Sequence, residues 1–246
     1  MASESKRSII VTGSSRGIGR AIAARLGKDG HNVTVNYAGN QAAALETVAE
    51  VEKAGGRAIA VGADVSKPDD VQRLFDETQK AFGTLDGLVN NAGIMITKPI
   101  AETDLATFDK TFATNVRGVF LAMQQAAKRL GPGGRIINFS TSSTPLNLPG
   151  YATYCASKAA VEVYTRILAK ELRGRNITVN AVAPGPVGTE LFFEGKSQET
   201  IDRLAKLNPF ERLGEPKDIA GIVAFLLTPE AEWINGQIIR ANGGMV

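Results

Sequence analysis

Tyr154 and Lys158 stand four residues apart in the sequence, and together they form a pair that could handle protons. In a helix this spacing places both side chains on one face. A nearby cation favours the phenolate and lowers the pKa of a phenol from its usual value of about 10 toward neutrality. The pair therefore predicts a tyrosine that donates or accepts a proton near neutral pH.

A glycine-rich segment follows the first predicted strand and leads into a helix, with the sequence Thr12-Gly13-Ser14-Ser15-Arg16-Gly17-Ile18-Gly19. Glycines allow the tight turn and the close backbone approach that a pyrophosphate needs. The helix that begins near Gly17 directs its free N–H groups and the positive end of its dipole at the same anion. We therefore predict a dinucleotide site whose phosphate contacts come from Gly13, Ser15, Arg16, Gly17, Ile18 and Gly19.

The end of the second predicted strand indicates which dinucleotide is bound. An NAD site usually carries an acidic residue there, which holds the ribose 2′-hydroxyl. The segment 35–40, which includes the predicted cofactor contacts Asn36 and Tyr37, has no acid. Its absence removes a repulsion against a 2′-phosphate, and the Arg16 guanidinium could pair with that phosphate. The cofactor is therefore predicted to be NADP(H).

Four motifs occur in order along nearly the whole chain: the glycine turn at 12–19, Asn90-Asn91-Ala92-Gly93, Tyr154-x3-Lys158 and Pro184-Gly185. This combination resembles the short-chain dehydrogenase/reductase family, and most of all bacterial 3-oxoacyl-carrier-protein reductase-like carbonyl reductases. The resemblance implies an oxidoreductase that transfers a hydride between NADP(H) and a carbonyl or alcohol carbon. It also implies a homotetramer.

Roles for individual residues follow from this resemblance. Tyr154 matches the catalytic acid and base, Lys158 the residue that holds the nicotinamide ribose and lowers the tyrosine pKa, and Asn115 the support of a water in a proton relay. The remaining matches concern the cofactor: Asp64 and Val65 at the adenine, Asn91, Ala92 and Gly93 at the adenosine ribose and sheet centre, and Pro184, Gly185, Val187 and Thr189 at the carboxamide.

The position of the catalytic hydroxyl is ambiguous. The family serine usually lies 13 residues before the tyrosine, and 154 − 13 = 141, which is Thr141. By residue type Ser142 fits better, if the loop between it and Tyr154 is one residue shorter than is usual in the family. Either hydroxyl can donate to a developing alkoxide. We favour Ser142 from the sequence.

Short apolar runs alternate with helical patterns and predict one α/β domain over residues 1–246. The expected Rossmann-type architecture is a doubly wound, seven-stranded, mostly parallel sheet with helices on both faces. Strands are predicted at 8–12, 32–36, 58–62, 85–90, 135–139, 178–182 and 237–240, and helices at 18–28, 41–54, 68–82, 105–130, 151–172 and 219–227.

The segment 186–212 has no strong pattern and is predicted to be a substrate loop or lid, since long irregular segments inside compact domains often are. Phe192 and Phe193 in this segment either cap the substrate pocket or anchor the loop.

Composition excludes several other classes. The 246 residues carry a net charge of only +3 without a basic run, so nucleic acid is not an expected partner. One cysteine implies no disulfide, and one histidine leaves no material for a His-based metal site or triad. No apolar run suggests a signal peptide or membrane span, so a cytoplasmic protein without a metal is expected.

The leading hypothesis is an NADPH-dependent reductase of a ketone or aldehyde, with 3-oxoacyl thioesters among the candidate substrates. One alternative is a dehydrogenase that oxidises an alcohol, polyol or steroid. The other is a dinucleotide-binding sensor without turnover, although such a sensor has no physical need for Asn115, Tyr154 and Lys158 together.

Overall fold

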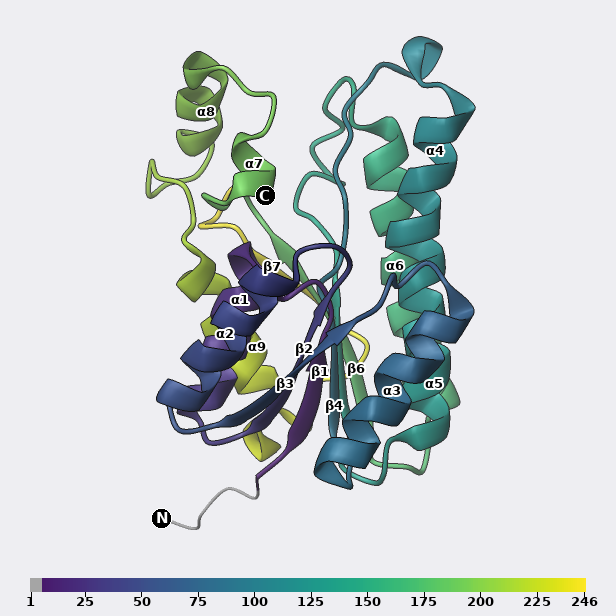
Figure 1. The fold of residues 1–246 in the computed structure, drawn as a ribbon. Helices are drawn as coiled ribbons and strands as arrows, with labels where there is room; N and C mark the ends of the chain where they lie inside the picture. Colours follow the sequence, from purple (N-terminus) through teal and green to yellow (C-terminus); the bar gives the residue numbers. More distant parts are fainter. Residues whose placement is uncertain (1–5) are drawn as a thin grey trace.

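A single parallel sheet forms the centre of the computed structural model, which describes residues 6–246 (Figure 1). The described residues contribute seven strands in the order β3-β2-β1-β4-β5-β6-β7, and every neighbouring pair is parallel. The strands are β1 (Ser8–Val11), β2 (Asn32–Tyr37), β3 (Arg57–Gly62), β4 (Gly87–Asn90), β5 (Arg135–Phe139), β6 (Thr178–Pro184) and β7 (Ile238–Ala241). The predicted Rossmann-type architecture is confirmed.

Helices cover both faces of this sheet, with α1, α2 and α9 on one face and α3, α5 and α6 on the other (Figure 1). Neighbouring strand residues such as Ile9 and Ile10 are fully buried in separate apolar clusters. This two-sided burial explains why the strands read as continuous apolar runs. The helices are α1 (Gly17–Lys28), α2 (Gln41–Lys53), α3 (Pro68–Phe82), α5 (Gly118–Arg129), α6 (Ala152–Glu171) and α9 (Pro216–Leu226).

Local signals in the sequence fix several helix starts. The Asn40 side chain accepts a hydrogen bond from the Ala43 N–H at 3.0 Å and so caps α2. Helices α3 and α9 begin at Pro68 and Pro216, where a missing N–H costs nothing because the first turn has no partner for it. The predicted boundaries of these elements therefore lie within a few residues of the observed ones.

The helix predicted at 105–130 is observed at 105–129, but it contains a π-helical turn that the sequence analysis did not predict. The chain forms α4 (Leu105–Phe112), then the π-helical turn η2 (Ala113–Arg117), then α5. Within η2 the fully buried Asn115 side chain bonds both the N–H and the carbonyl of Ile94 at 2.9 Å. Hydrophobic periodicity does not register such a tertiary contact, and π-helical turns often lie at functional sites.

The segment 186–212 lies beyond the carboxyl ends of the strands, with α4 on the opposite side of that end of the sheet (Figure 1). It contains two short helices, α7 (Glu190–Phe193) and α8 (Gln198–Ala205). Single 3-10 turns form at η1 (Ile100–Glu102) and η3 (Pro229–Ala231). Within residues 6–246, no helix combines the length and apolar character that crossing a bilayer requires.

The order of strands determines where a ligand can bind. Strands β1 and β4 are neighbours, and from them the chain winds outward in opposite directions. In open α/β sheets the crevice outside the carboxyl ends of strands at such a switch point is the usual ligand site.

Candidate active site

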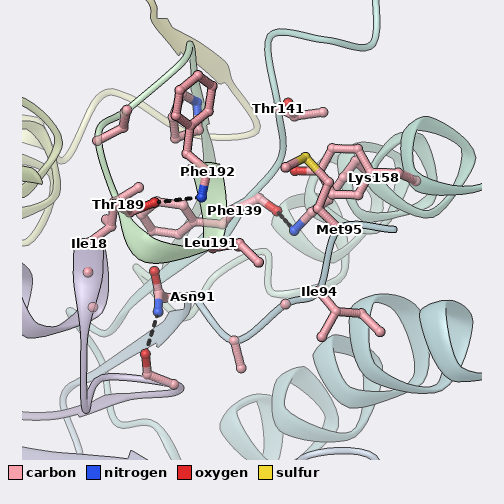
Figure 2. A pocket seen from close by; sticks show the side chains of 18 of the residues that line it. Ile18, Asn91, Ile94, Met95, Phe139, Thr141, Lys158, Thr189, Leu191 and Phe192 are labelled. Carbon is pink, nitrogen blue, oxygen red and sulfur yellow. Dashed lines mark hydrogen bonds between the residues drawn. The ribbon is translucent and has the colours of Figure 1, made fainter. Parts of the chain in front are cut away.

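One cavity of about 720 Å³ lies at this switch point and extends from the glycine turn to the 186–212 segment. Figure 2 shows Thr141, Met95 and Lys158 on one side of it, with Thr189 and Phe192 across from them. Every residue that the sequence analysis placed in the site lines this cavity, except Asn115 and Ser142.

The glycine turn has no room for side chains. Gly13 has a φ of +60°, and a Cβ there would lie 2.9 Å from the Ala92 Cα. A Cβ on Gly19 would lie 2.5 Å from the Gly13 carbonyl oxygen. The Asn91 amide donates to the carbonyls of Thr12 and Gly13 at 2.9 Å and fastens the turn to the end of β4.

The start of α1 suits an anion. Arg16 occupies the N-cap position without a capping side-chain hydrogen bond, and the first turn holds no acidic residue. Gly17, Ile18 and Gly19 line the cavity at this point. Uncapped N–H groups at the positive end of a helix dipole match the charge of a diphosphate, so the residues present fit a dinucleotide.

Asn36 lines the cavity and shapes the turn through its side chain, and its role as a cofactor contact stays a prediction. Its Oδ1 accepts from the Gly13 N–H at 3.1 Å, and its Nδ2 donates to the carbonyls of Val61 and Ala63. The residue is 1% exposed, so its amide is occupied within the fold. Tyr37 follows it and lines the cavity, as predicted.

The predicted adenine contacts also lie at the cavity wall. Asp64 and Val65 both line it. The Asp64 carboxylate accepts hydrogen bonds from the backbone N–H and the hydroxyl of Ser66, which fixes the turn after β3. Val65 packs so closely against α5 that a Cβ on Gly118 would lie 2.8 Å from its side chain.

Arg16 lines the cavity and forms an ion pair with α7. Its guanidinium lies 3.0 Å from the Glu190 carboxylate at the start of α7, and both side chains are mostly exposed, at 62% and 71%. An exposed pair of this kind contributes at most about 1 kcal/mol. The guanidinium can therefore exchange this carboxylate for a phosphate at little cost.

Lys158 is buried in the cavity wall with 4% exposure, and its amine donates to the Phe139 carbonyl at the end of β5 at 2.8 Å (Figure 2). The amine lies 6.0 Å from the centroid of the Tyr154 ring, one helical turn away. Burial lowers the pKa of Lys158 to about 8.

The direction of the Tyr154 shift corrects the sequence analysis. Burial raises the pKa of the Tyr154 phenol to about 12, and the hydrogen bond with Thr141 only partly offsets this. The Lys158 amine is bound to a backbone carbonyl and makes no hydrogen bond to the phenol, so desolvation dominates. Within the protein alone, Tyr154 is therefore a phenol at neutral pH and suited to donate a proton.

The preference for Ser142 is wrong on geometry. Ser142 is fully buried, its hydroxyl donates to the Ala183 carbonyl at 2.8 Å, and that hydroxyl accepts from the Asn242 amide at 3.0 Å. Thr141 lines the cavity and hydrogen-bonds with the Tyr154 phenol. The residue given by ungapped spacing is thus the one that meets the cavity.

Asn115 lies behind the cavity wall. Besides bonding Ile94, its Nδ2 donates to the Ser157 hydroxyl at 3.1 Å and so joins η2 to α6. A Cβ on Gly93 would lie 3.3 Å from Asn115 Oδ1 and 3.4 Å from Lys158 Nζ, which shows how closely these groups pack. The water relay inferred from resemblance stays a prediction.

Phe192 and Phe193 have different positions. Phe192 is 9% exposed and lines the cavity, whereas Phe193 is 45% exposed and packs edge-on against its neighbour at a centroid distance of 5.5 Å. Thr189 also lines the cavity, and its hydroxyl caps α7 by accepting from the Phe192 N–H.

Much of the remaining wall could not be found from the sequence. It is mainly apolar, and it comes from loops and short helices that carry no motif: Ile94, Met95, Ile96, Leu146, Leu148, Tyr151, Leu191, Leu204, Leu207 and Met245. Lys110, Glu194 and Lys196 add the charged groups on this side.

A Rossmann-type sheet with an uncapped helix start and a buried tyrosine–lysine pair in one cavity is typical of a dinucleotide-dependent oxidoreductase. Residues 13–246 match the family model described as enoyl-(acyl carrier protein) reductase. A short-chain type dehydrogenase/reductase of Picea abies is 49% identical, covering 98% of this chain and 92% of the relative. The chain belongs to the short-chain dehydrogenase/reductase family.

Two further similar proteins have names that state a reaction and a cofactor. An NADPH-dependent aldehyde reductase-like protein, chloroplastic, of Arabidopsis thaliana is 48% identical, covering 98% of this chain and 94% of that protein. The crystal structure of the angucycline C-6 ketoreductase LanV with bound NADP superposes with a TM-score of 0.92 at 40% identity, covering 97% of this chain and 95% of that chain.

Substitution of each hydroxyl tests the corrected assignment. Thr141→Ala removes the donor at the cavity and is expected to lower kcat for carbonyl reduction by about 100-fold or more, as loss of an oxyanion donor does. Ser142→Ala is expected to keep kcat for a small aldehyde within a few fold. Steady-state kinetics with NADPH and propanal measure both. A larger loss of kcat in Ser142→Ala than in Thr141→Ala would contradict the assignment made from the geometry.

The pH profile of reduction follows from the two shifted pKa values. The Tyr154 pKa of about 12 keeps the phenol protonated throughout the neutral and mildly alkaline range. The Lys158 charge is present below its pKa of about 8 and is lost above it. We expect kcat/KM for reduction to be flat near neutrality and to fall as the pH rises through about 8, whereas Lys158→Gln should show no such step. A wild-type profile that stays flat to about pH 10 would refute the assignment.

Proposed function

We propose that this enzyme reduces a ketone or aldehyde to an alcohol, with NADP(H) as its cofactor and Tyr154 as the proton donor. The observation that carries the proposal is the meeting of Tyr154, Thr141 and Lys158 with the glycine turn in one cavity. The NADPH-dependent aldehyde reductase-like relative and the NADP-bound ketoreductase support the same class of reaction.

The residues divide the work between polarisation and proton transfer. The Thr141 hydroxyl donates to the carbonyl oxygen of the substrate, and the Tyr154 phenol donates its proton to that oxygen. When bound, NADPH supplies the hydride that reaches the carbonyl carbon. The Lys158 ammonium, held by the Phe139 carbonyl, lies close enough to stabilise negative charge left on the phenol.

The phosphate end of the cavity favours NADP(H). Neither Asn36 nor Tyr37 is acidic, so no carboxylate at the end of β2 opposes a 2′-phosphate. Arg16 lines the cavity beside this point, held only by an exposed carboxylate. A guanidinium that pairs with a phosphate gains strong charge-assisted hydrogen bonds.

The walls around Tyr154 indicate an apolar substrate. Met95, Tyr151 and Phe192 line the cavity together with the leucines of α8 and the segment after it. Methionine and aromatic side chains adapt to flat or irregular apolar ligands. We therefore propose a substrate that carries an apolar body beside its carbonyl group, such as an aryl or cyclic ketone.

A 3-oxoacyl thioester stays a predicted candidate. Two of the basic side chains that could receive an acidic carrier protein, Arg129 and Arg175, are already hydrogen-bonded within the protein. Arg129 is hydrogen-bonded to Asp76 and Gln79, and Arg175 to the carbonyls of Ala127 and Leu130.

The homotetramer and the cytoplasmic location also stay predictions. In support of a homo-oligomer, several large apolar side chains are exposed on α4, α5 and α6: Leu105, Phe108, Phe120, Val163 and Ile167.

Tyr154→Phe tests the proposed chemistry, because it removes the acidic proton and keeps the ring. Turnover of NADPH with a panel of ketones and aldehydes should fall by at least about 100-fold, the usual contribution of general acid catalysis. The affinity for NADPH, followed by its fluorescence, should stay within about two-fold. A variant with near-full turnover would refute the proposed role of Tyr154, and a wild-type protein inert toward the whole panel would refute the proposed reaction.

Arg16→Ala tests the cofactor assignment. Loss of the guanidinium should raise the KM for NADPH by about ten-fold or more, since hydrogen bonds to charged groups contribute about 1.5–3 kcal/mol. The KM for NADH, which has no 2′-phosphate, should change little and serves as the internal control. Equal changes for the two cofactors would exclude a contact between Arg16 and that phosphate.

A further inference from the structure

The segment Asn242–Val246 lies beside the active site, at the end of the chain. Met245 lines the cavity that contains Thr141 and Tyr154. In Figure 1 the end of the chain lies next to α7, and Leu204 and Leu207 from that side of the cavity line it as well. The segment therefore forms part of the cavity wall on the side of α7.

Asn242 holds this segment in place with all the hydrogen bonds that an amide side chain can form. Its Oδ1 accepts from the N–H groups of Gly244 and Met245 at 3.0 and 3.2 Å. Its Nδ2 donates to the Ser142 hydroxyl at 3.0 Å and to the Val246 carbonyl at 3.3 Å. The turn that presents Met245 is thus built around one side chain.

The far end of this hydrogen-bond chain is the loop that carries the catalytic hydroxyl. Ser142 is fully buried and passes the link on, donating to the Ala183 carbonyl at the end of β6. Its own N–H donates to the Pro184 carbonyl at 2.9 Å. Thr141 immediately precedes Ser142 in the sequence. The hydrogen bond between Asn242 and Ser142 therefore fixes Met245 relative to the Thr141 hydroxyl at the carbonyl site.

Close packing holds the segment from two sides. A Cβ on Gly185 would lie 2.9 Å from the Asn242 Cα, and a Cβ on Gly243 would lie 3.0 Å from Asn208 Oδ1. Asn208 is 6% exposed and belongs to the 186–212 segment. The turn is therefore wedged between the end of β6 and the substrate loop, with little freedom to move away from the cavity.

We propose that Met245 is a specificity-determining residue that contacts the apolar body of the substrate, and that Asn242 is the positioning residue that fixes it there. This inference rests on the proposed reduction of an apolar ketone. A wall at this place acts on substrates large enough to reach it and leaves a small aldehyde unaffected. It changes substrate affinity, because the groups that polarise the carbonyl and donate the proton lie on other elements.

The first test compares a bicyclic ketone, β-tetralone, with propanal. Met245→Ala should raise the KM for β-tetralone by about ten-fold, as loss of apolar contact in a pocket does, with kcat within about two-fold. The constants for propanal should stay within about two-fold. Val246→Ala is the matched control, because Val246 adjoins Met245 without lining the cavity, and it should behave as the wild type. If Met245→Ala changed the KM for β-tetralone and for propanal equally, or changed neither, the proposal would be overturned.

A binding measurement keeps this proposal separate from the proposed reaction. Calorimetric titration of β-tetralone into the NADP⁺-bound protein requires no turnover, and Met245→Ala should weaken binding by about ten-fold there too. If the wild type reduced neither carbonyl, the proposed reaction would fail while the titration still decided the role of Met245. An unchanged dissociation constant in Met245→Ala would exclude the contact.

A double-mutant cycle tests the role of Asn242. Asn242→Ala should raise the KM for β-tetralone as Met245→Ala does, and the double variant should be no worse than the more impaired single variant, because both changes remove the same wall. A merely structural role would lower kcat for β-tetralone and propanal alike, together with the melting temperature. That result, or additive effects in the cycle, would contradict the positioning role.

Discussion

The buried ammonium group of Lys158 is the constraint on which the site depends. An isolated charge removed from water costs several kcal/mol, so its position must provide compensation. The Phe139 carbonyl at the end of β5 provides one acceptor, and this contact fixes α6 against the carboxyl edge of the sheet. Tyr154, one turn earlier on α6, is thereby placed beside Thr141, which follows the same strand. The pair is thus positioned by the sheet as much as by its own helix.

The other half of the site depends on the same edge. The glycine turn follows β1, and Asn91 at the end of β4 fastens it there. The η2 turn interrupts the helix beside it, so that Asn115 can join Ile94 to Ser157 on α6. Parallel strands bring these loops together because all their carboxyl ends lie at one edge. A single cavity therefore combines an anion-binding helix start with a protonated phenol.

Much of this arrangement could be predicted from the sequence, because its signals are local. The glycine turn, the four-residue spacing of Tyr154 and Lys158 and the alternation of strands and helices each depend on neighbours along the chain. The errors have tertiary causes. Whether Thr141 or Ser142 meets the cavity depends on Ala183 and Asn242, and the sign of the Tyr154 shift depends on burial. The position of Met245 likewise depends on contacts between segments distant in sequence.

The central claim is that one cavity receives the diphosphate at the start of α1 and the reacting ring beside Tyr154 and Thr141. A crystal structure of the protein with NADP⁺ bound measures this directly. We expect the diphosphate at the N–H groups of Gly17–Gly19 and the nicotinamide on the wall formed by Thr141, Tyr154 and Lys158. A diphosphate bound away from α1, or a nicotinamide ring remote from the Tyr154 hydroxyl, would contradict the account.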